Sequence, residues 1–454
     1  MLFTTNLRTS QDTIYAPASS TAKAGIAIVR ISGPSSKYAM EVLGSKVGQA
    51  RFAKITKIFH PKTKNLIDEC ITIFYPSPTS FTGEDVIELN IHGGRAVLNL
   101  TLDSLSQVPG LRLAEPGEFS KRRFMNGKMD LTQAEALIDL INAETEAQHR
   151  QAIKQLSGSL GSLYENWRTQ LLHIIGLIEA YIDFPDEDLP KDIIVNVEKQ
   201  VTSLHNKILN HLTDNHRGEK LCNGFYITII GEPNVGKSSL MNNIAKRDVA
   251  IVSSIAGTTR DAVEIHLDIA GYPVTIADTA GIRECSDFLE NESIRRTIAK
   301  VREADLKILV LEANSLHNIS IVIQEFIDEN TIIVFNKIDL INNPERLNLI
   351  RINNKTPILI SAQEQIGITD LLDKLSTHVS NFFSITDAPL ITRQRHRENL
   401  EHCKSHLVIF DLKKNIELAA EDLRLASSYL SRITGKIDID SILEEIFSNF
   451  CIGK

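Results

Sequence analysis

Apolar residues change their spacing three times along the chain. Up to about residue 120 they form short runs typical of β-strands, such as Gly25–Ile31 and Cys70–Tyr75, separated by Gly and Pro turns. From Asp130 to Ile182 they recur every three or four residues, which predicts helices. From Phe225 to about His378 strand-like runs alternate with helical stretches, and this alternation predicts a doubly wound α/β domain.

The helical texture occurs on both sides of the α/β block. It returns at Arg393, after a break at Pro389, and the segment Thr213–Gly224 before the block is polar and turn-rich. This order predicts one helical domain that the α/β block interrupts, because the two ends of an inserted domain commonly lie close together. The strands expected in the block are Tyr226–Ile230, Val274–Ala277, Leu306–Leu311, Ile332–Phe335 and Ile358–Ile360.

The sequence thus predicts a multidomain protein of α/β and α class. We expect an N-terminal α+β domain over residues 1–120, a first helical part over 121–215, an inserted α/β domain over 216–380, and a second helical part with the C-terminal tail over 381–454. The length of 454 residues and the 43% hydrophobic content are sufficient for several cores.

Composition excludes several classes of protein. The most apolar helical stretch, Leu171–Ile182, is too short to cross a bilayer, and the first residues do not resemble a signal peptide. The five cysteines occur singly and without a CxxC pair, which argues against a disulfide framework or a cysteine-rich zinc site. We expect a cytoplasmic protein.

Charge is spread unevenly. The net charge is −8, yet residues 1–130 hold 16 Lys/Arg and 11 Asp/Glu. A polyanion could bind one face of this N-terminal part, and the alternative is a mildly basic solvated surface.

Residues Gly231 to Ser238 read GEPNVGKS and match the phosphate-binding pattern GxxxxGK[ST] between an expected strand and an expected helix. Glycines allow backbone N–H groups to wrap phosphates, and the helix N-terminus adds positive potential. Lys237 is expected to reach the β- and γ-phosphates and Ser238 to bind Mg²⁺.

Three further motifs follow in the order of a guanine nucleotide site. Asp278 begins DTAG at a strand end, Asp339 ends NKID, and Ser361 begins SAQ. A carboxylate such as that of Asp339 can accept two hydrogen bonds from guanine and none of this kind from adenine. A backbone N–H of Ser361-Ala362 could meet guanine O6, and Thr259 is expected to bind Mg²⁺. The residues expected to contact GTP are Asn234, Val235, Gly236, Lys237, Ser238, Ser239, Ser253, Ser254, Ile255, Ala256, Gly257, Thr258, Thr259, Asp278, Thr279, Ala280, Gly281, Asn336, Lys337, Asp339, Ser361 and Ala362.

Ile282 stands directly after DTAG, where many small GTPases carry a glutamine that orients the attacking water. An apolar side chain cannot orient water, and the transition state still needs a positive charge between the phosphates. Asn234, with backbone carbonyls of the Ser253–Thr258 segment, could hold K⁺ in that place. The alternative for Asn234 is an asparagine that stabilises the turn.

Motifs outside the α/β block carry a family resemblance. They are GIAIVRISG at Gly25–Gly33, FTGED at Phe81–Asp85, Glu88, HGG at His92–Gly94, PGEFS at Pro116–Ser120, FMNGKMDLTQAE at Phe124–Glu135 and CIGK at Cys451–Lys454. On these residues the chain resembles the MnmE (TrmE) family of tRNA-modification GTPases over essentially its full length.

The resemblance implies an N-terminal domain that dimerises and binds 5-formyltetrahydrofolate or a related tetrahydrofolate. The matching contact positions are Arg30, Glu88, Lys128 and the C-terminal Lys454. Glu88 could hold the pterin edge, and Arg30 and Lys128 could pair with the anionic glutamate tail. From the residues alone, a surface salt bridge for Glu88 and a solvated Lys128 remain the alternatives.

For the nucleotide site the resemblance implies K⁺-dependent hydrolysis, with Asn234, Ser253, Ile255 and Thr258 as K⁺ ligands. Glu290 matches the glutamate that positions water, so the catalytic set is Glu290, Asn234, Lys237 and Asp278. A homodimer would join an FAD-dependent MnmG (GidA)-type partner in a heterotetramer. Together they would use a folate one-carbon unit to add an aminomethyl or carboxymethylaminomethyl group at C5 of the wobble uridine of tRNA.

The sequence departs from the family pattern in two places. The first strand is preceded by Ser20-Thr-Ala-Lys-Ala rather than a Gly-rich start, and Gln363 stands where Lys is usual. Cys451 could be a catalytic thiol or part of a tail beside the folate site, and its terminal box does not suit prenylation. His92-Gly-Gly94 is not an esterase motif, because the chain has no GxSxG.

Two rival functions remain open. A ribosome-assembly GTPase predicts an RNA-binding domain after the α/β block, such as one with a GXXG loop, and residues 393–454 contain none. A folate-binding regulatory protein with a GTPase switch differs only in whether modified tRNA depends on it.

Overall fold

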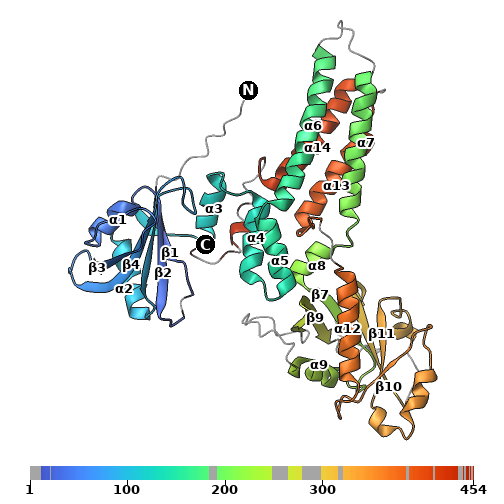
Figure 1. The fold of residues 1–454 in the computed structure, drawn as a ribbon. Helices are drawn as coiled ribbons and strands as arrows, with labels where there is room; N and C mark the ends of the chain where they lie inside the picture. Colours follow the sequence, from blue (N-terminus) through green and yellow to red (C-terminus); the bar gives the residue numbers. More distant parts are fainter. Residues whose placement is uncertain are drawn as a thin grey trace, which may run out of the picture. The chain divides into compact units, whose positions relative to one another are not determined.

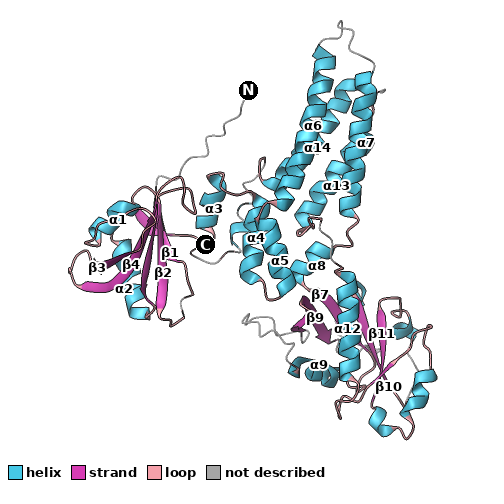
Figure 2. Ribbon diagram, viewed as in Figure 1, coloured by secondary structure: helices cyan, strands magenta, loops and turns pink. Residues whose placement is uncertain are grey.

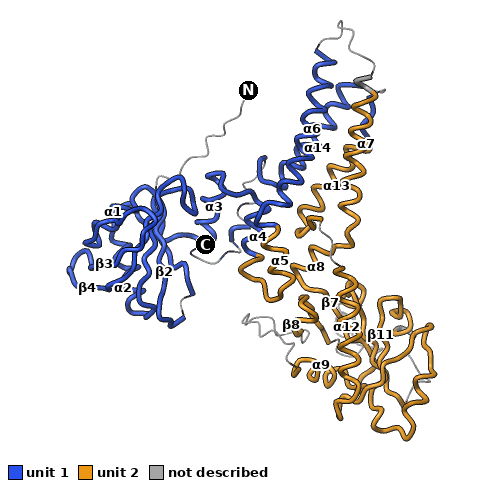
Figure 3. Tube along the Cα trace, viewed as in Figure 1, with its two compact units in different colours: residues 1–138, 155–193, 409–454 blue, residues 139–154, 194–408 orange. Residues whose placement is uncertain are grey.

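The computed structural model describes residues 12–20, 22–183, 192–247, 264–278, 298–314, 321–384, 388–412 and 415–437, with positions 443, 446–448, 450 and 453. The chain forms two compact units, coloured separately in Figure 3: residues 1–138, 155–193 and 409–454, and residues 139–154 and 194–408. Among the described helices, none has the length and apolar character needed to cross a membrane.

Unit 1 contains a six-stranded sheet with strand order β3-β4-β5-β2-β1-β6. All neighbouring strands pair antiparallel except β1 and β6, which are parallel. The strands and helices of this part are β1 (Thr13–Pro17), β2 (Ile26–Ser32), α1 (Ser36–Val42), β3 (Lys54–Phe59), β4 (Leu66–Tyr75), β5 (Val86–His92), α2 (Arg95–Ser106), β6 (Leu111–Leu113) and α3 (Glu118–Met125).

One face of this sheet carries the core of the N-terminal part. Helix α1 contributes Met40 and Leu43 to the core, and α2 contributes Leu98 and Leu105. Buried residues alternate with more exposed ones along β4 because successive side chains of a strand point to opposite faces. This one-sided burial explains the short alternating runs seen in the sequence.

Two long helices form the helical part of unit 1 (Figure 1). Helix α6 (Ser159–Asp183) packs along α14 (Ile416–Thr434), and Arg168 Nε donates to Ser431 Oγ across them at 2.9 Å. Helix α14 begins where the Asn415 side chain accepts from two backbone N–H groups, and it ends at Gly435 in the left-handed conformation.

The C-terminal tail packs against the start of α4 (Leu131–Asn142). Phe447 and Phe450 join Phe124 and Leu131 in one apolar cluster. Gly453, with a φ of 98°, lies so close to the Pro17 carbonyl that any side chain would clash. Gly453 therefore lies beside the end of β1.

Unit 2 contains a second six-stranded sheet with order β12-β11-β10-β7-β9-β8, parallel except for the edge strand β8 (Figure 2). Its elements are α5 (Glu146–Leu156), α7 (Asp192–Leu212), α8 (Arg217–Asn223), β7 (Phe225–Ile230), α9 (Lys237–Lys246), β8 (Glu264–Ile269), β9 (Tyr272–Asp278), β10 (Leu306–Glu312), α11 (Ile321–Gln324), β11 (Thr331–Asn336), β12 (Ile358–Leu359), α12 (Ile368–Phe382) and α13 (Gln394–Ile409), with short 3₁₀ turns at Ile338–Leu340 and Pro344–Leu349.

The central strands of this sheet are buried on both faces. Ile308 and Val310 of β10 pack into one core, with residues of α9 and α12. Leu309 and Leu311 point to the opposite core. Burial on both faces explains why these strands are continuous apolar runs in the sequence. The doubly wound α/β prediction is confirmed.

Two details differ from the sequence-based expectation. The segment predicted to be turn-rich contains helix α8, and α12 extends past His378 to Phe382. Helix α8 is short and polar, so its stability depends on Arg397 of α13, which donates to Glu219 at 2.9 Å and to Asp214 at 2.7 Å. Such tertiary contacts override local propensity. The four-part division of domains stays a prediction.

The described cysteines are free. Cys70, Cys222 and Cys403 form no disulfide, and burial raises the pKa of each thiol to about 12. These thiols are therefore poor nucleophiles at neutral pH.

A largely buried histidine next to Arg397 and Asp214 makes the stability of unit 2 dependent on pH. His211, near the end of α7, has its pKa lowered to about 4 by burial, with Asp214 opposing and Arg397 reinforcing the shift. Between pH 6.5 and about 4 the unfolded chain binds a proton that the folded protein does not, so stability falls as pH drops through this window. We expect a loss of about 2 kcal/mol between pH 7 and pH 5.

Hydrogen exchange of the α7 amides at both pH values measures this loss. In His211→Gln this loss of unfolding free energy between pH 7 and pH 5 should disappear. His173→Gln, at an exposed position of α6, should show the same loss as the wild type. Equal pH dependence in wild type and His211→Gln would exclude the assignment.

Candidate nucleotide site

The phosphate-binding pattern lies where the sequence predicts it. Strand β7 ends at Ile230, α9 begins at Lys237, and the loop between them carries Asn234 with a φ of 63° and Gly236 with a φ of 98°. A Cβ at Gly236 would lie 2.2 Å from Asn336 Nδ2. The glycine is therefore required both by its backbone conformation and by close contact with the neighbouring loop.

Lys237 is held inside this loop. Its Nζ donates to the carbonyl oxygens of Gly231 at 3.1 Å and Glu232 at 2.9 Å, and burial lowers the pKa of its ammonium group. It has no salt-bridge partner within the described part of the chain. An anion bound in the loop would supply the missing negative charge.

Ser238 and Asp278 come together from two elements. The Ser238 Oγ at the start of α9 donates to Asp278 Oδ2 at the end of β9, at 2.6 Å. The other oxygen, Asp278 Oδ1, is buried and has no hydrogen-bond partner among the described residues. Hydroxyl and carboxylate oxygens suit Mg²⁺, which retains waters and takes few protein ligands.

The Asn336 amide joins three loops of the site. Its Nδ2 donates to the Val235 carbonyl of the phosphate loop at 2.7 Å, and its Oδ1 accepts from the Ala362 N–H at 2.9 Å. Asn336 is buried at the end of β11. The described hydrogen bonds of this side chain are to the protein, and its predicted contact with the nucleotide stays a prediction.

The base-recognition motif surrounds Asp339. Its Oδ1 accepts from Ser361 Oγ at 2.5 Å, which orients the carboxylate, while Lys337 pairs with Glu312 at 2.8 Å. The backbone N–H of Ser361 donates to Ile366, and that of Ala362 donates to Asn336. For the predicted contact with guanine O6, one of these two N–H groups must either donate to both acceptors or give up its present partner.

The phosphate loop, α9 and the base-recognition loops line one pocket of about 440 Å³. Its walls are Asn234, Gly236, Ser239, Asn242, Asn243, Lys246, Asn336, Lys337, Asp339, Leu340, Ala362 and Gln363. Our sequence analysis missed Asn242, Asn243, Lys246 and Leu340. The first three share one face of α9 with Ser239, and their spacing of three, four and seven residues could have indicated it.

Part of the predicted site lies outside the described residues. This holds for Ser253, Ser254, Ile255, Ala256, Gly257, Thr258, Thr259, Thr279, Ala280, Gly281, Ile282 and Glu290. Their assigned roles stay predictions.

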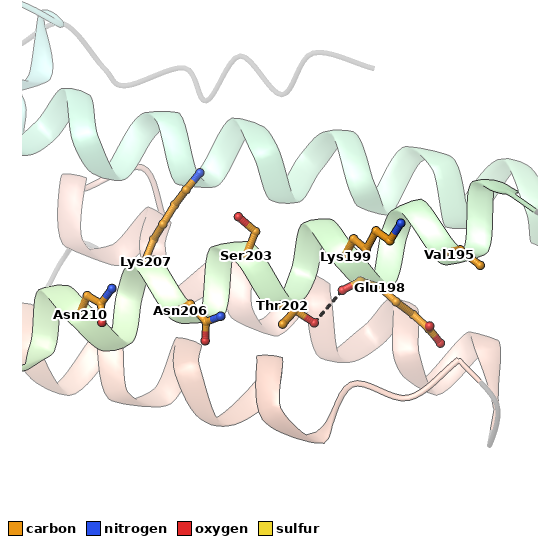
Figure 4. A pocket seen from close by; sticks show the side chains of 8 residues that line it. All are labelled: Val195, Glu198, Lys199, Thr202, Ser203, Asn206, Lys207 and Asn210. Atoms are coloured by element: carbon orange, nitrogen blue, oxygen red, sulfur yellow. Dashed lines mark hydrogen bonds between the residues drawn. The ribbon is translucent and has the colours of Figure 1, made fainter.

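Two larger hollows occur elsewhere. One, of about 710 Å³, follows a single face of α7 (Figure 4) and is lined by Val195, Glu198, Lys199, Thr202, Ser203, Asn206, Lys207 and Asn210. All its lining groups come from one helix, so no groups converge on a ligand. The other, also about 710 Å³, lies in unit 1 between α6 and the end of α14, where Lys436 pairs with Glu165 at 2.7 Å.

The predicted folate residues lie in unit 1. Arg30 on β2 and Glu88 on β5 are direct cross-strand neighbours, joined at 2.8 and 3.0 Å, and Tyr75 OH donates to the other Glu88 oxygen at 3.4 Å. The salt bridge considered as an alternative for Glu88 is thus present. The Lys128 backbone donates to the Arg123 carbonyl, and Lys454 lies outside the described residues.

A phosphate loop between strand and helix, an aspartate on the neighbouring strand end and a guanine-type NKxD loop define a P-loop GTPase. Family models match most of the chain: "GTP-binding protein TrmE N-terminus" over residues 13–128 and "MnmE helical domain" over residues 131–451. The chain belongs to the MnmE family of tRNA modification GTPases.

Individual relatives agree with this assignment. The tRNA modification GTPase MnmE of Rickettsia rickettsii (strain Sheila Smith) is 48% identical over 98% of this chain and 100% of its own length. That of Rickettsia akari (strain Hartford) is 47% identical over the same shares.

Among solved structures, a variant of Aquifex aeolicus Era bound to GDP and AlF4⁻ matches at 24% identity with a TM-score of 0.29, covering 40% of this chain and 66% of that one. The G domain of the T. maritima FeoB iron transporter matches at 24% identity with a TM-score of 0.26, covering 34% of this chain and 98% of its own.

Asn336→Ala should weaken nucleotide binding. The substitution leaves the Val235 carbonyl and the Ala362 N–H without their partner, at about 1–3 kcal/mol for each buried group. We expect GDP affinity to fall at least about tenfold, measured with a fluorescent nucleotide. Asn330→Ala, at an exposed turn, is the matched control. Unchanged affinity in Asn336→Ala would show that the loops hold their shape without this amide.

Proposed function

We propose that this chain hydrolyses GTP and that hydrolysis drives the modification of tRNA. The observation that carries the proposal is the convergence of Lys237, Asp278 and Asp339 on the carboxyl ends of β7, β9 and β11. Membership of the family supplies tRNA as the substrate. The site of modification is C5 of the wobble uridine.

Each described residue has a role in this proposal. Lys237 binds the β- and γ-phosphates, Ser238 binds Mg²⁺ directly, and Asp278 binds it through water. The buried, unpartnered Asp278 Oδ1 supports a metal at this place. Thr259 is the second Mg²⁺ ligand, and the Asp339 oxygen that Ser361 does not contact accepts from the guanine edge. Mg²⁺ supplies charge neutralisation when bound.

Asn234 would hold a monovalent cation, which would supply the positive charge needed between the phosphates. The left-handed Asn234 lines the pocket at the phosphate loop, which supports it as a K⁺ ligand with Ser253, Ile255 and Thr258. The side chain of Ile282 cannot orient water, and Glu290 takes that role. Together with Lys237 and Asp278, Asn234 and Glu290 form the catalytic set.

The one-carbon unit comes from a tetrahydrofolate bound in unit 1. Arg30, Glu88 and Lys128 hold it, with Lys454 at the chain end. The packing of Gly453 against Pro17 supports this, because Pro17 pairs with Val29, next to Arg30. A second support is a buried guanidinium nitrogen, Arg123 Nε, that has no partner among the described residues. The folate supplies the carbon that is transferred.

The chain works as a homodimer with an FAD-dependent MnmG-type protein, in a heterotetramer in the cytoplasm. Ile55 and Ile71 support a dimer surface: they lie opposite each other on β3 and β4, and they are 72% and 43% exposed. Contiguous exposed apolar surface marks protein interfaces more often than single exposed side chains do.

GTP turnover should depend on K⁺. Replacing K⁺ by Na⁺ at equal ionic strength should lower the rate at least about tenfold, because the smaller ion does not match the coordination set. Phosphate release under both salts measures this, and in Asn234→Ala the two rates should converge. Equal GTP turnover rates of the wild type in K⁺ and Na⁺ would show that hydrolysis does not depend on K⁺.

The tRNA role is tested by nucleoside mass spectrometry on cells that lack this protein. C5-aminomethyl-type wobble uridines should disappear and return with the wild type, but not with Asp278→Ala, which removes the Mg²⁺-linked carboxylate. Unchanged wobble uridines would contradict the proposal and favour a ribosome-assembly or regulatory function.

A further inference from the structure

The ring of Phe81 is contacted by two guanidinium groups. The Arg30 Cζ lies 5.0 Å from the ring centroid and the Arg123 Cζ lies 4.7 Å from it. Arg30 comes from β2, Arg123 from α3, and Phe81 from the loop before β5. Both contacts are within cation–π distance, so the ring helps to fix the positions of two cations.

Arg123 lacks a carboxylate partner within the described residues. Its Nε is buried and makes no hydrogen bond there, and burial lowers the pKa of its guanidinium. Its neighbour Arg122 is the opposite case, because it binds Asp12, Glu84 and Glu118. Two adjacent arginines on one helix thus differ in that only one is neutralised by the protein.

The carboxylates near this ring are bound by other protein groups, and Glu84 pairs with Arg122. Glu88 is already bound by Arg30 through one oxygen and by Tyr75 through the other. Arg51 lies over Tyr75 at 5.9 Å, and the Lys128 backbone is bonded to that of Arg123. No ion pair of Arg51, Arg123 or Lys128 occurs in the described ranges. Arg123, which has no ion pair in the described ranges, therefore favours an anionic ligand.

We propose that Arg123 binds a carboxylate in the tail of the folate, and that the preferred ligand is a tetrahydrofolate carrying several γ-linked glutamates. This inference rests on the proposed folate site and names its ligand class. Arg30 and Lys128 serve the first glutamate, and Arg123 serves a carboxylate farther along the tail.

The physical argument is charge compensation. A partly desolvated guanidinium without a counterion is unfavourable, and a carboxylate that accepts two parallel N–H bonds from it relieves that cost. Each added glutamate brings one more carboxylate, and hydrogen bonds between charged groups are stronger than those between neutral groups. The oligoglutamate form should therefore bind at least about tenfold more tightly than the monoglutamate.

Isothermal titration of the full-length protein with 5-formyltetrahydrofolate as mono- and triglutamate tests the inference. The wild type should prefer the triglutamate about tenfold. Arg123→Gln should bind both forms within about twofold of each other. Lys121→Gln, with the same charge change on α3, should retain the wild-type preference. Melting temperatures of the three proteins establish that each is folded.

The outcomes separate this inference from the folate proposal. If the wild type binds neither form, the folate proposal fails. If it binds both forms equally, or if Arg123→Gln keeps the preference, Arg123 has no role in the tail and the inference is wrong. An equal loss in Arg123→Gln and Lys121→Gln would mean that only general charge attracts the ligand, which also overturns it.

Discussion

The nucleotide site depends on one buried amide. Asn336 holds the phosphate loop at Val235 and the last strand loop at Ala362, so the two walls of the pocket cannot move apart independently. Its Nδ2 also lies where a side chain at Gly236 would be, which restricts that position to glycine. An amide can do this because it carries a donor and an acceptor on two separate atoms; a carboxylate has no donor, and a hydroxyl has a single oxygen for both bonds.

Much of unit 2 follows from the sequence because its constraints are local. A parallel strand buried on both faces must be apolar throughout, so the apolar runs at β7, β10 and β11 could be recognised as strands in the sequence. The phosphate motif also has a fixed spacing. Helix α8 was missed because its stability comes from Arg397, 178 residues from Glu219 in the chain, and no local pattern encodes such a partner.

The same limit applies to individual side chains of the sites. The sequence predicted Lys237, Asp278 and Asp339 from their motifs, and the structure brings them to the carboxyl ends of β7, β9 and β11, on one edge of the sheet. It could not predict that Asn336 contacts protein loops. The sequence also could not distinguish the environments of Arg122 and Arg123, which are neighbours of the same type. Arg122 pairs with Asp12 and Glu84, which are far from it in the chain. Charge pairing of this kind is a property of tertiary structure.

Both candidate sites keep a buried polar group without a protein partner among the described residues. In unit 2 it is Asp278 Oδ1, and in unit 1 it is Arg123 Nε. Buried polar atoms are normally paired, so an unpaired one costs stability that the surrounding core must offset. Asp278 ends a strand of a sheet buried on both faces, and Arg123 belongs to a helix whose Phe119 and Phe124 are buried. The opposite signs of the two groups indicate what each site lacks, a cation at Asp278 and an anion at Arg123.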